Sequence, residues 1–347
     1  MMPRRSTVLA FARSVHASLA EVPAASAVRR RGPRGAFAAC ALAFALPAGD
    51  LLAQEACPDG LAPDATAVGS TVSCDSRVDS LAKVVDADIG TGSSIGARST
   101  VYASRLEAVT LGEGSQVVAV RAGELELPVT FGAGSIVYPG VRAFAADVGA
   151  GAVIGRGSRL SGGRGIDFQF IGARARIGEN VELGVRRLGD DARIGDASRI
   201  GESTTAGDAF SFGERSVWVV GGEIGNGVTI GDDVRIEGGF DAADGVSIGN
   251  GVSVGFRVSI GESASLYREA VLGNGSRIGA NALIGRGADI GGDAVVGERV
   301  LVLRRATIGA GADIGAGSVV DANAAVAAGA VVPANSRVAA DGSVTPL

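Results

Sequence analysis

Residues 272–297 read LGNGSRIGANALIGRGADIGGDAVVG, and the pattern of this stretch decides the fold. An aliphatic residue recurs at every sixth position, and glycine usually follows it directly. The same phase runs from Ile224 to Val338, which is twenty consecutive hexads without an insertion or a deletion. The residue four positions after each aliphatic is small or apolar almost every time, as at Ala282 and Ala288.

A period of six fits neither an α-helix, which repeats at about 3.6 residues, nor a free-standing strand, which repeats at 2. It predicts a repeat architecture in which each hexad is a short strand followed by a turn. Within a hexad, the aliphatic residue and the residue four later both face inward, and the positions between them form the turn. Glycine suits such a turn because a tight corner needs positive φ or close approach of another backbone. A single hexad cannot bury its own apolar face, so the coils must stack.

Several motifs resemble the bacterial transferase hexapeptide-repeat superfamily. They are Ile284-Gly285, Ile308-Gly309-Ala310-Gly311-Ala312 and the closing Val331-Val332-Pro333-Ala334-Asn335-Ser336-Arg337-Val338. The resemblance implies an all-β fold, a left-handed parallel β-helix with three hexads in each triangular coil. We expect this hexapeptide-repeat solenoid to span residues 89–338, with about fourteen coils and a length of ~65 Å. The fold alone does not define the chemistry, because it hosts enzymes and non-enzymes alike.

The phase breaks at a few places before Ile224. The stretch from Arg121 to Phe131 interrupts it and is the best candidate for a protruding loop, and residues 162–165 are a second. Trp218 falls on an inward position and is bulky for a narrow prism. The sequence leaves open whether the phase shifts locally onto Val217 or the ring caps a kink.

Residues 1–53 differ in composition from the rest of the chain and are interpreted as a leader. They carry seven arginines against Glu21 and Asp50, whereas the remaining residues have a net charge of −10. Within them, segment 28–53 has a basic stretch, an apolar run from Ala36 to Leu46 and then small residues, the layout of a secretory signal peptide. We therefore expect export to the periplasm, the cell surface or the medium. The alternative readings are a mitochondrial-like tail, a disordered tail and a short buried helix.

The acidic body, which contains no basic run, argues against a nucleic acid as a partner. No apolar stretch reaches the roughly 18 residues needed to span a bilayer, so no membrane span is expected.

Two of the three cysteines, Cys57 and Cys74, lie after the leader. In an exported protein, they are expected to form a disulfide that fastens an N-terminal cap, residues 54–88, against the first coil. Two unrelated buried thiols are the alternative. The residues after Val338, 339–347, are expected to form a tail that lacks a covering helix.

The residues offer little for catalysis. The acyltransferases that the chain resembles use a histidine as general base, and the one histidine of this sequence is His16, in the leader. A metal site of several histidines and a Ser-His-Asp site are excluded on the same ground. Adjacent carboxylates such as Asp190-Asp191 and Asp232-Asp233 are typical of solvated turns. We therefore predict no catalytic residue, no metal site and no cofactor.

One surface pattern points to binding. Arg268, Arg286 and Arg304 are eighteen residues apart, so at one coil per eighteen residues they form a column on one side of the solenoid. Guanidinium groups spaced by about 4.8 Å suit the carboxylates or phosphates of an anionic glycan. Solvated arginines near carboxylates such as Glu269 are the competing reading, and Tyr267 lies beside the column.

The leading functional hypothesis is a non-catalytic, exported structural, scaffold or binding protein of the bacterial cell envelope. The first alternative is a hexapeptide-repeat acyltransferase, dependent on acyl-CoA or acyl-carrier protein, with an atypical site. The second is a bactofilin-like polymer-forming protein. The resemblance implies a homotrimer, and end-to-end stacking is the other mode of self-association.

Overall fold

The computed structural model describes residues 60–106, 108–118, 120–122, 125–127, 129–144, 146–161 and 169–347. The chain divides into the units Met1–Glu55 and Ala56–Leu347, and all described residues belong to the second. The predicted leader (residues 1–53, with His16) and Cys57 lie outside the described residues. Among the described residues, we find no helix that is long and apolar enough to cross a membrane.

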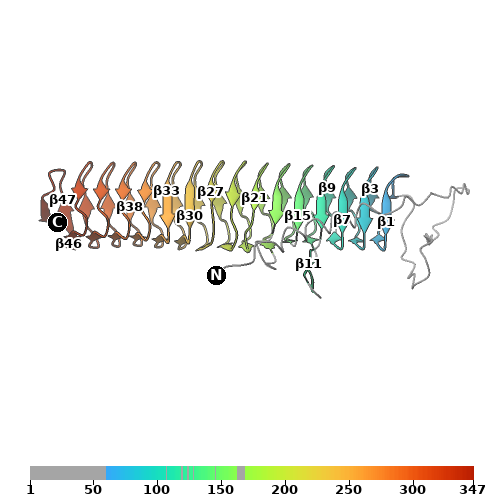
Figure 1. Ribbon diagram of the computed structural model, residues 1–347, viewed down its shortest axis with the longest axis horizontal. Coiled ribbons are helices and arrows are strands. Elements are labelled where there is room, and N and C mark those ends of the chain that lie inside the picture. The colour runs from blue at the N-terminus through green and yellow to red at the C-terminus, as the bar shows by residue number, and fades with distance from the viewer. Residues whose placement is uncertain are drawn as a thin grey trace, which may run out of the picture. The chain divides into compact units, whose positions relative to one another are not determined.

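The described chain is a parallel β-helix, which confirms the predicted fold class. The strands stack from β1 to β47 and form three parallel sheets, which the chain visits in turn in every coil (Figure 1). The first and second sheets have 15 strands each and the third has 16, close to the expected number of coils. The coil therefore has three corners, the first–second, the second–third and the third–first corner.

The strands of the three sheets are as follows. The first sheet contains β1 (Thr66–Val68), β4 (Lys83–Val85), β7 (Thr100–Tyr102), β10 (Gln116–Val118), β15 (Arg142–Phe144), β18 (Arg159–Ser161), β21 (Glu182–Leu183), β24 (Arg199–Ile200), β27 (Val217–Trp218), β30 (Arg235–Gly238), β33 (Ser253–Phe256), β36 (Val271–Leu272), β39 (Asp289–Ile290), β42 (Thr307–Ile308) and β45 (Ala325–Val326). The second contains β2 (Thr71–Val72), β5 (Asp88–Ile89), β8 (Arg105–Leu106), β13 (Thr130–Phe131), β16 (Ala146–Val148), β19 (Gln169–Ile171), β22 (Arg187–Leu188), β25 (Thr204–Ala206), β28 (Gly222–Ile224), β31 (Asp241–Ala242), β34 (Ser259–Ile260), β37 (Arg277–Ile278), β40 (Val295–Val296), β43 (Asp313–Ile314) and β46 (Val331–Val332). The third contains β3 (Arg77–Val78), β6 (Ser94–Ile95), β9 (Thr110–Leu111), β14 (Ile136–Val137), β17 (Val153–Ile154), β20 (Arg176–Ile177), β23 (Arg193–Ile194), β26 (Ser211–Phe212), β29 (Thr229–Ile230), β32 (Ser247–Ile248), β35 (Ser265–Leu266), β38 (Leu283–Ile284), β41 (Leu301–Val302), β44 (Val319–Val320), β47 (Ser336–Val338) and β48 (Val344–Pro346).

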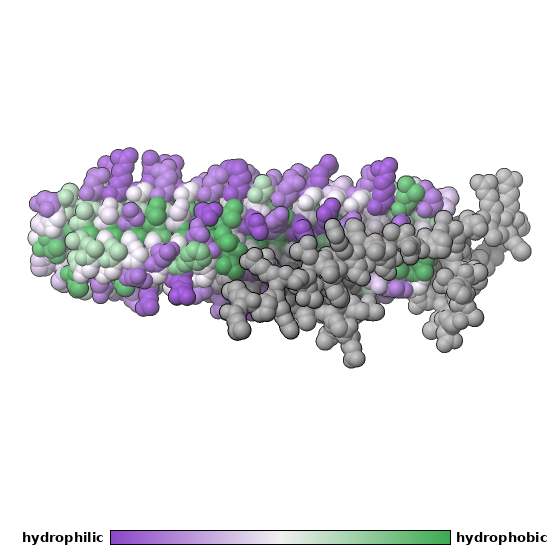
Figure 2. All heavy atoms as spheres, viewed as in Figure 1, coloured by the Kyte–Doolittle hydropathy of each residue, from purple (hydrophilic) through white to green (hydrophobic). Residues whose placement is uncertain are grey.

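The hexad pattern maps directly onto this architecture. In the hexad that begins at Ile284, Ile284 and Ala288 are both fully buried in the interior. Arg286 and Asp289, in contrast, are exposed, because the corner and the first strand residue point outward. Figure 2 shows the result on one side of the molecule, where hydrophilic residues gather along an edge at which the coils turn.

The glycine after the aliphatic is required by close packing between coils. A methyl group on Gly285 would lie 2.6 Å from the carbonyl carbon of Leu303, one coil later. The positive φ of the corner falls two residues further on, where non-glycine residues such as Asp233 (φ 56°) and Asn281 (φ 57°) are common. Of the two reasons that the sequence offered for glycine, close backbone approach is therefore the one that applies after the aliphatic.

The β-helix begins earlier than residue 89, which corrects the predicted boundary of the cap. β1 already pairs in parallel with β4, from Thr66↔Lys83 to Val68↔Val85. The strict period missed these coils because some of their corners are one residue short, as between the buried Val84 and Ile89. Much of segment 54–88 thus forms the first coils.

The interruption after β10 is a hairpin. β11 (Val120–Ala122) and β12 (Leu125–Leu127) pair antiparallel, outside the three large sheets. The predicted protruding segment from Arg121 to Phe131 is therefore confirmed in place, although its last residues, Thr130 and Phe131, already belong to β13. The second candidate loop, residues 162–165, lies outside the described residues.

Trp218 keeps its inward phase. Its side chain is fully buried, its ring meets Phe240 edge-on with centroids 5.7 Å apart, and its indole Nε1 donates to the carbonyl of Gly221 over 3.1 Å. The inward position four residues later is Gly222, where a methyl group would lie 2.7 Å from the indole ring. The bulk of the tryptophan is thus accommodated by the missing side chain of its hexad partner.

The C-terminal tail folds back on the last coil. β48 pairs antiparallel with β47, from Ser336↔Pro346 to Val338↔Val344. The third sheet therefore ends in an antiparallel strand, β48, instead of in the parallel strand β47, and all three residues of β48 are exposed.

Candidate functional site

The three predicted site arginines lie together, one above another, at the third–first corner. β35 pairs with β38 through Leu266↔Ile284, and β38 pairs with β41 through Ile284↔Val302, so the residues two positions later are also in register. The backbone confirms this alignment, because Gly287 donates its N–H to the carbonyl of Arg268 over 3.1 Å.

The side chains of this column face solvent. Arg268, Arg286 and Arg304 are all exposed. Arg286 Nε lies 3.3 Å from Glu269 Oε2, so its charge is partly compensated within the chain. Tyr267, directly before Arg268, is 51% exposed.

The same corner carries acids in the preceding coils, which the sequence analysis did not recognise. Reading back from Arg268 in steps of eighteen gives Asn250, Asp232, Glu214 and Asp196. The strand registers from β23 to β35 place all of them in one line with the arginines. We call these seven residues, from Asp196 to Arg304, the corner column.

Hydrogen bonds along the corner hold several of its polar side chains in place. Asp232 Oδ1 accepts the backbone N–H of Glu214 over 2.8 Å, and Asn250 Oδ1 accepts that of Asp232 over 3.1 Å. Asp196 Oδ1 accepts the N–H of Glu179 in the same way over 2.8 Å. These contacts satisfy turn donors, so the acids at these positions also have a structural role.

The residues that follow the corner column add local ion pairs. Arg215 contacts Asp233 one coil later (Nη2 to Oδ2, 2.8 Å) and its neighbour Glu214 (Nη1 to Oε2, 3.1 Å). Hydrogen bonds from Arg215 lower the pKa of the Asp233 carboxyl below its ordinary value. At the second–third corner, Arg174 contacts Asp191 over 2.6 Å and lowers its pKa for the same reason.

The pair between Arg215 and Asp233 predicts a small pH effect. Because the folded-state pKa of Asp233 is lowered, the pair stabilises the fold above the ordinary aspartate range, and the contribution is lost as pH falls through the folded pKa. Asp233→Asn should therefore flatten the loss of melting temperature between about pH 5 and pH 2. The control is Asp289→Asn on an outward strand position. An equal flattening in both variants would show that the effect is not specific to this pair.

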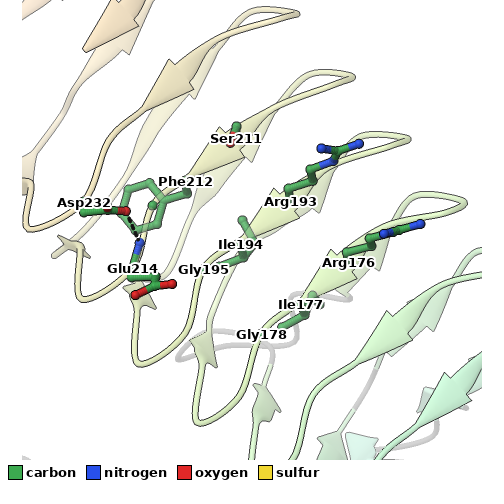
Figure 3. Close-up of a pocket in the computed structure, with 11 residues that line it drawn as sticks. Arg176, Ile177, Gly178, Arg193, Ile194, Gly195, Ser211, Phe212, Glu214 and Asp232 are labelled. Carbon is green, nitrogen blue, oxygen red and sulfur yellow. Dashed lines mark hydrogen bonds between the residues drawn. The ribbon is translucent and has the colours of Figure 1, made fainter. Parts of the chain in front are cut away.

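A shallow groove of about 330 Å³ lies beside the acidic half of the column (Figure 3). Its floor is formed by the strands β20, β23 and β26 and by the glycines that follow them, Gly178, Gly195 and Gly213. Arg176 and Arg193 lie at one end, and Glu214 and Asp232 lie at the other. Because the glycines have no side chains there, the groove is open to a side chain of another molecule.

The remaining predicted residues are the two cysteines and the pairs of adjacent acids. Cys74 belongs to the described residues, but Cys57 does not, so the disulfide stays a prediction. In the described part of the chain, no group of three or more His, Cys, Asp or Glu is arranged to hold a metal ion. Asp190 Oδ1 accepts the backbone N–H of Ala173, and Asp232 acts in the same way, so one acid of each adjacent pair serves a turn.

Comparisons with known proteins gave matches among solved structures alone. No protein-family model and no curated protein sequence matches the chain. Among solved structures, the UDP-N-acetylglucosamine acyltransferase from Campylobacter jejuni is 15% identical, with 59% of this chain and 65% of that chain covered and a TM-score of 0.21. The Arabidopsis UDP-N-acetylglucosamine acyltransferase is 12% identical, with 69% and 65% covered and a TM-score of 0.22. The Francisella novicida enzyme of the same name is 16% identical, with 83% and 69% covered and a TM-score of 0.14.

Proposed function

We propose that this chain is a non-catalytic, exported β-helical rod that serves as a structural or binding scaffold of a bacterial cell envelope. The observation that carries the proposal is the unbroken register after Arg193. From there to Val338, every coil takes eighteen residues in all three sheets, as in Arg193↔Ser211 and Val319↔Arg337. Such a chain repeats its outward positions at a fixed spacing, which suits long, regular contacts with another extended molecule.

The chemistry of the sequence supports the same reading. An acyltransferase of the hexapeptide type takes a proton from the acceptor with a histidine, and the single histidine of this chain is His16. The pKa values of Asp191 and Asp233 are lowered by exposed ion pairs, and a lowered pKa makes a carboxylate a weaker base. Export is supported by the basic and apolar segment 28–53, which has the layout of a signal peptide.

The experiment that tests this function is expression of the full chain in a Gram-negative host, followed by fractionation and mass measurement without reduction. We expect a chain shortened by cleavage within segment 28–53, located outside the cytoplasm, that does not consume acyl-CoA or acyl-carrier-protein donors. The matched control is Leu42→Arg, which interrupts the apolar run and should retain the full-length chain in the cytoplasm.

Two outcomes would contradict the proposal. A full-length cytoplasmic chain that transfers acyl groups to a sugar nucleotide would indicate an acyltransferase. A full-length cytoplasmic chain that assembles into filaments would indicate a polymer-forming protein instead.

A further inference from the structure

We propose that two copies of this chain pair side by side and antiparallel along the corner column, with a two-fold axis at Asn250. The inference goes beyond the proposed function and does not depend on export. It is carried by the order of charges along the corner and by the shape of the surface next to it.

The corner column is self-complementary. From the N-terminal side it reads Asp196, Glu214, Asp232, Asn250, Arg268, Arg286 and Arg304. Three acids precede a neutral centre and three arginines follow it, at one residue per coil. When a second copy is turned end for end about Asn250, each acid meets an arginine: Asp232 meets Arg268, Glu214 meets Arg286, and Asp196 meets Arg304 of the second copy.

The charges of the residues that directly follow the column members do not cancel this charge pattern. Including the residue after each column member, the acidic half carries four carboxylates and one guanidinium, and the basic half carries four guanidiniums and one carboxylate. The halves therefore keep net charges of −3 and +3. The ion pairs Arg215–Asp233 and Arg286–Glu269 lie within one copy and leave both totals unchanged.

The spacing of the two columns matches by construction. Both copies present one column residue per coil, about 4.8 Å apart, so all the opposed pairs are in register at once. Contacts of this kind are isologous, because each pair occurs twice about the two-fold axis. A parallel arrangement in register would place Arg286 against Arg286 and Asp232 against Asp232, which electrostatic repulsion disfavours.

The surface beside the column is complementary in shape. The same two-fold axis places Leu303 of the second copy over Gly195, which lines the groove, and the exposed Tyr267 over Gly231. At both places a side chain meets a residue that has none: Tyr267 is 51% exposed, and Leu303 is half-buried. The groove thus receives an apolar side chain, so the pairing does not depend on surface charges alone.

The favoured partner is a second copy and not an anionic polymer, because the acidic half of the same column repels a polyanion. A polyanion would use the arginines and leave the acids without a role in recognition. The self-pairing model uses both halves of the column and the groove together.

The experiment is a complementation of charge reversals, measured by sedimentation equilibrium of the full chain at low ionic strength. Arg286→Glu alone and Glu214→Arg alone should each weaken dimerisation by about tenfold or more, because each change creates two repulsive contacts. An equimolar mixture of the two variants should restore dimers, since both contacts become attractive in the mixed pair. Raising the salt should weaken the unaltered dimer.

Arg277→Glu on the outward side of β37 is the matched control, because it makes the same charge change away from the corner, and it should leave dimerisation unchanged. Circular dichroism of each variant checks that the β-helix is intact. Three outcomes would overturn the proposal. The chain could be monomeric at low salt, it could form dimers or trimers that neither charge reversal weakens, or the mixture of the two variants could fail to restore association. Monomers that bind an anionic polysaccharide through Arg286 would assign the column to a glycan.

Discussion

Gly201→Ala is expected to destabilise the β-helix by more than about 3 kcal/mol, because two coils approach too closely there for any side chain. A methyl group at this position would lie 1.8 Å from the carbonyl oxygen of Val219 in the next coil. That oxygen belongs to the backbone and cannot rotate away, so the coils must separate or the corner must deform. The hydrogen bond from Gly201 N–H to the carbonyl of Trp218 (2.8 Å) lies at the same contact and would be strained. Urea or thermal unfolding followed by circular dichroism measures the loss.

Gly227→Ala is the matched control for this prediction. Gly227 also lies at a corner, with φ of 65°, but an added methyl group would have no atom within 4 Å. Ala209 takes the equivalent corner position one coil earlier with φ of 54°, so alanine is tolerated there. We expect a cost of about 1 kcal/mol from the left-handed conformation alone. If both alanine variants lost the same stability, the spacing between coils would not be what requires glycine after the aliphatic.

The fold could be predicted from the sequence because the same positions of the hexad recur along the whole solenoid. A coil of eighteen residues buries the same positions every time. One hexad with an unusual residue therefore does not hide the pattern, because the following hexads restore it. The prediction was wrong at the start of the solenoid because it required six residues per side, whereas Val84 and Ile89 are five apart and both fully buried. A corner can be one residue shorter while the next aliphatic residue still points inward. Such a corner breaks a strict period of six, so the period alone does not detect these coils.

Only the basic half of the candidate site could be predicted from the sequence. The spacing of Arg268, Arg286 and Arg304 was sufficient to place them in one column. The same step of eighteen leads back through Asn250 to Asp232, but acids at a glycine corner are typical of solvated turns, so the spacing alone did not distinguish them. The ion pair between Arg286 and Glu269 needed the structure, since it depends on which way a long exposed side chain turns.

Trp218→Ala is expected to cost about 3 to 5 kcal/mol, the largest loss for any single side chain removed from the interior. The ring is fully buried, and the surrounding coils are held apart by their own backbone hydrogen bonds, so the cavity cannot easily close. Gly222 offers no side chain to fill the space, and Phe240 would lose its edge-on contact at 5.7 Å. The carbonyl of Gly221 would also lose the indole donor at 3.1 Å.

Phe256→Ala is the comparison that separates a cavity from the loss of an aromatic residue. Phe256 is 45% exposed and lies two coils later in the same sheet, so its removal should cost less than about 1 kcal/mol. Trp218→Phe should fall between the two, because it keeps ring volume but leaves the carbonyl of Gly221 without its donor. Chemical unfolding of the three variants gives the order. A loss at Trp218 no larger than that at Phe256 would mean that the coils relax around a missing core side chain. Neighbouring coils are tied by backbone hydrogen bonds along all three sides, which is why we expect the cavity to persist and the full cost to appear.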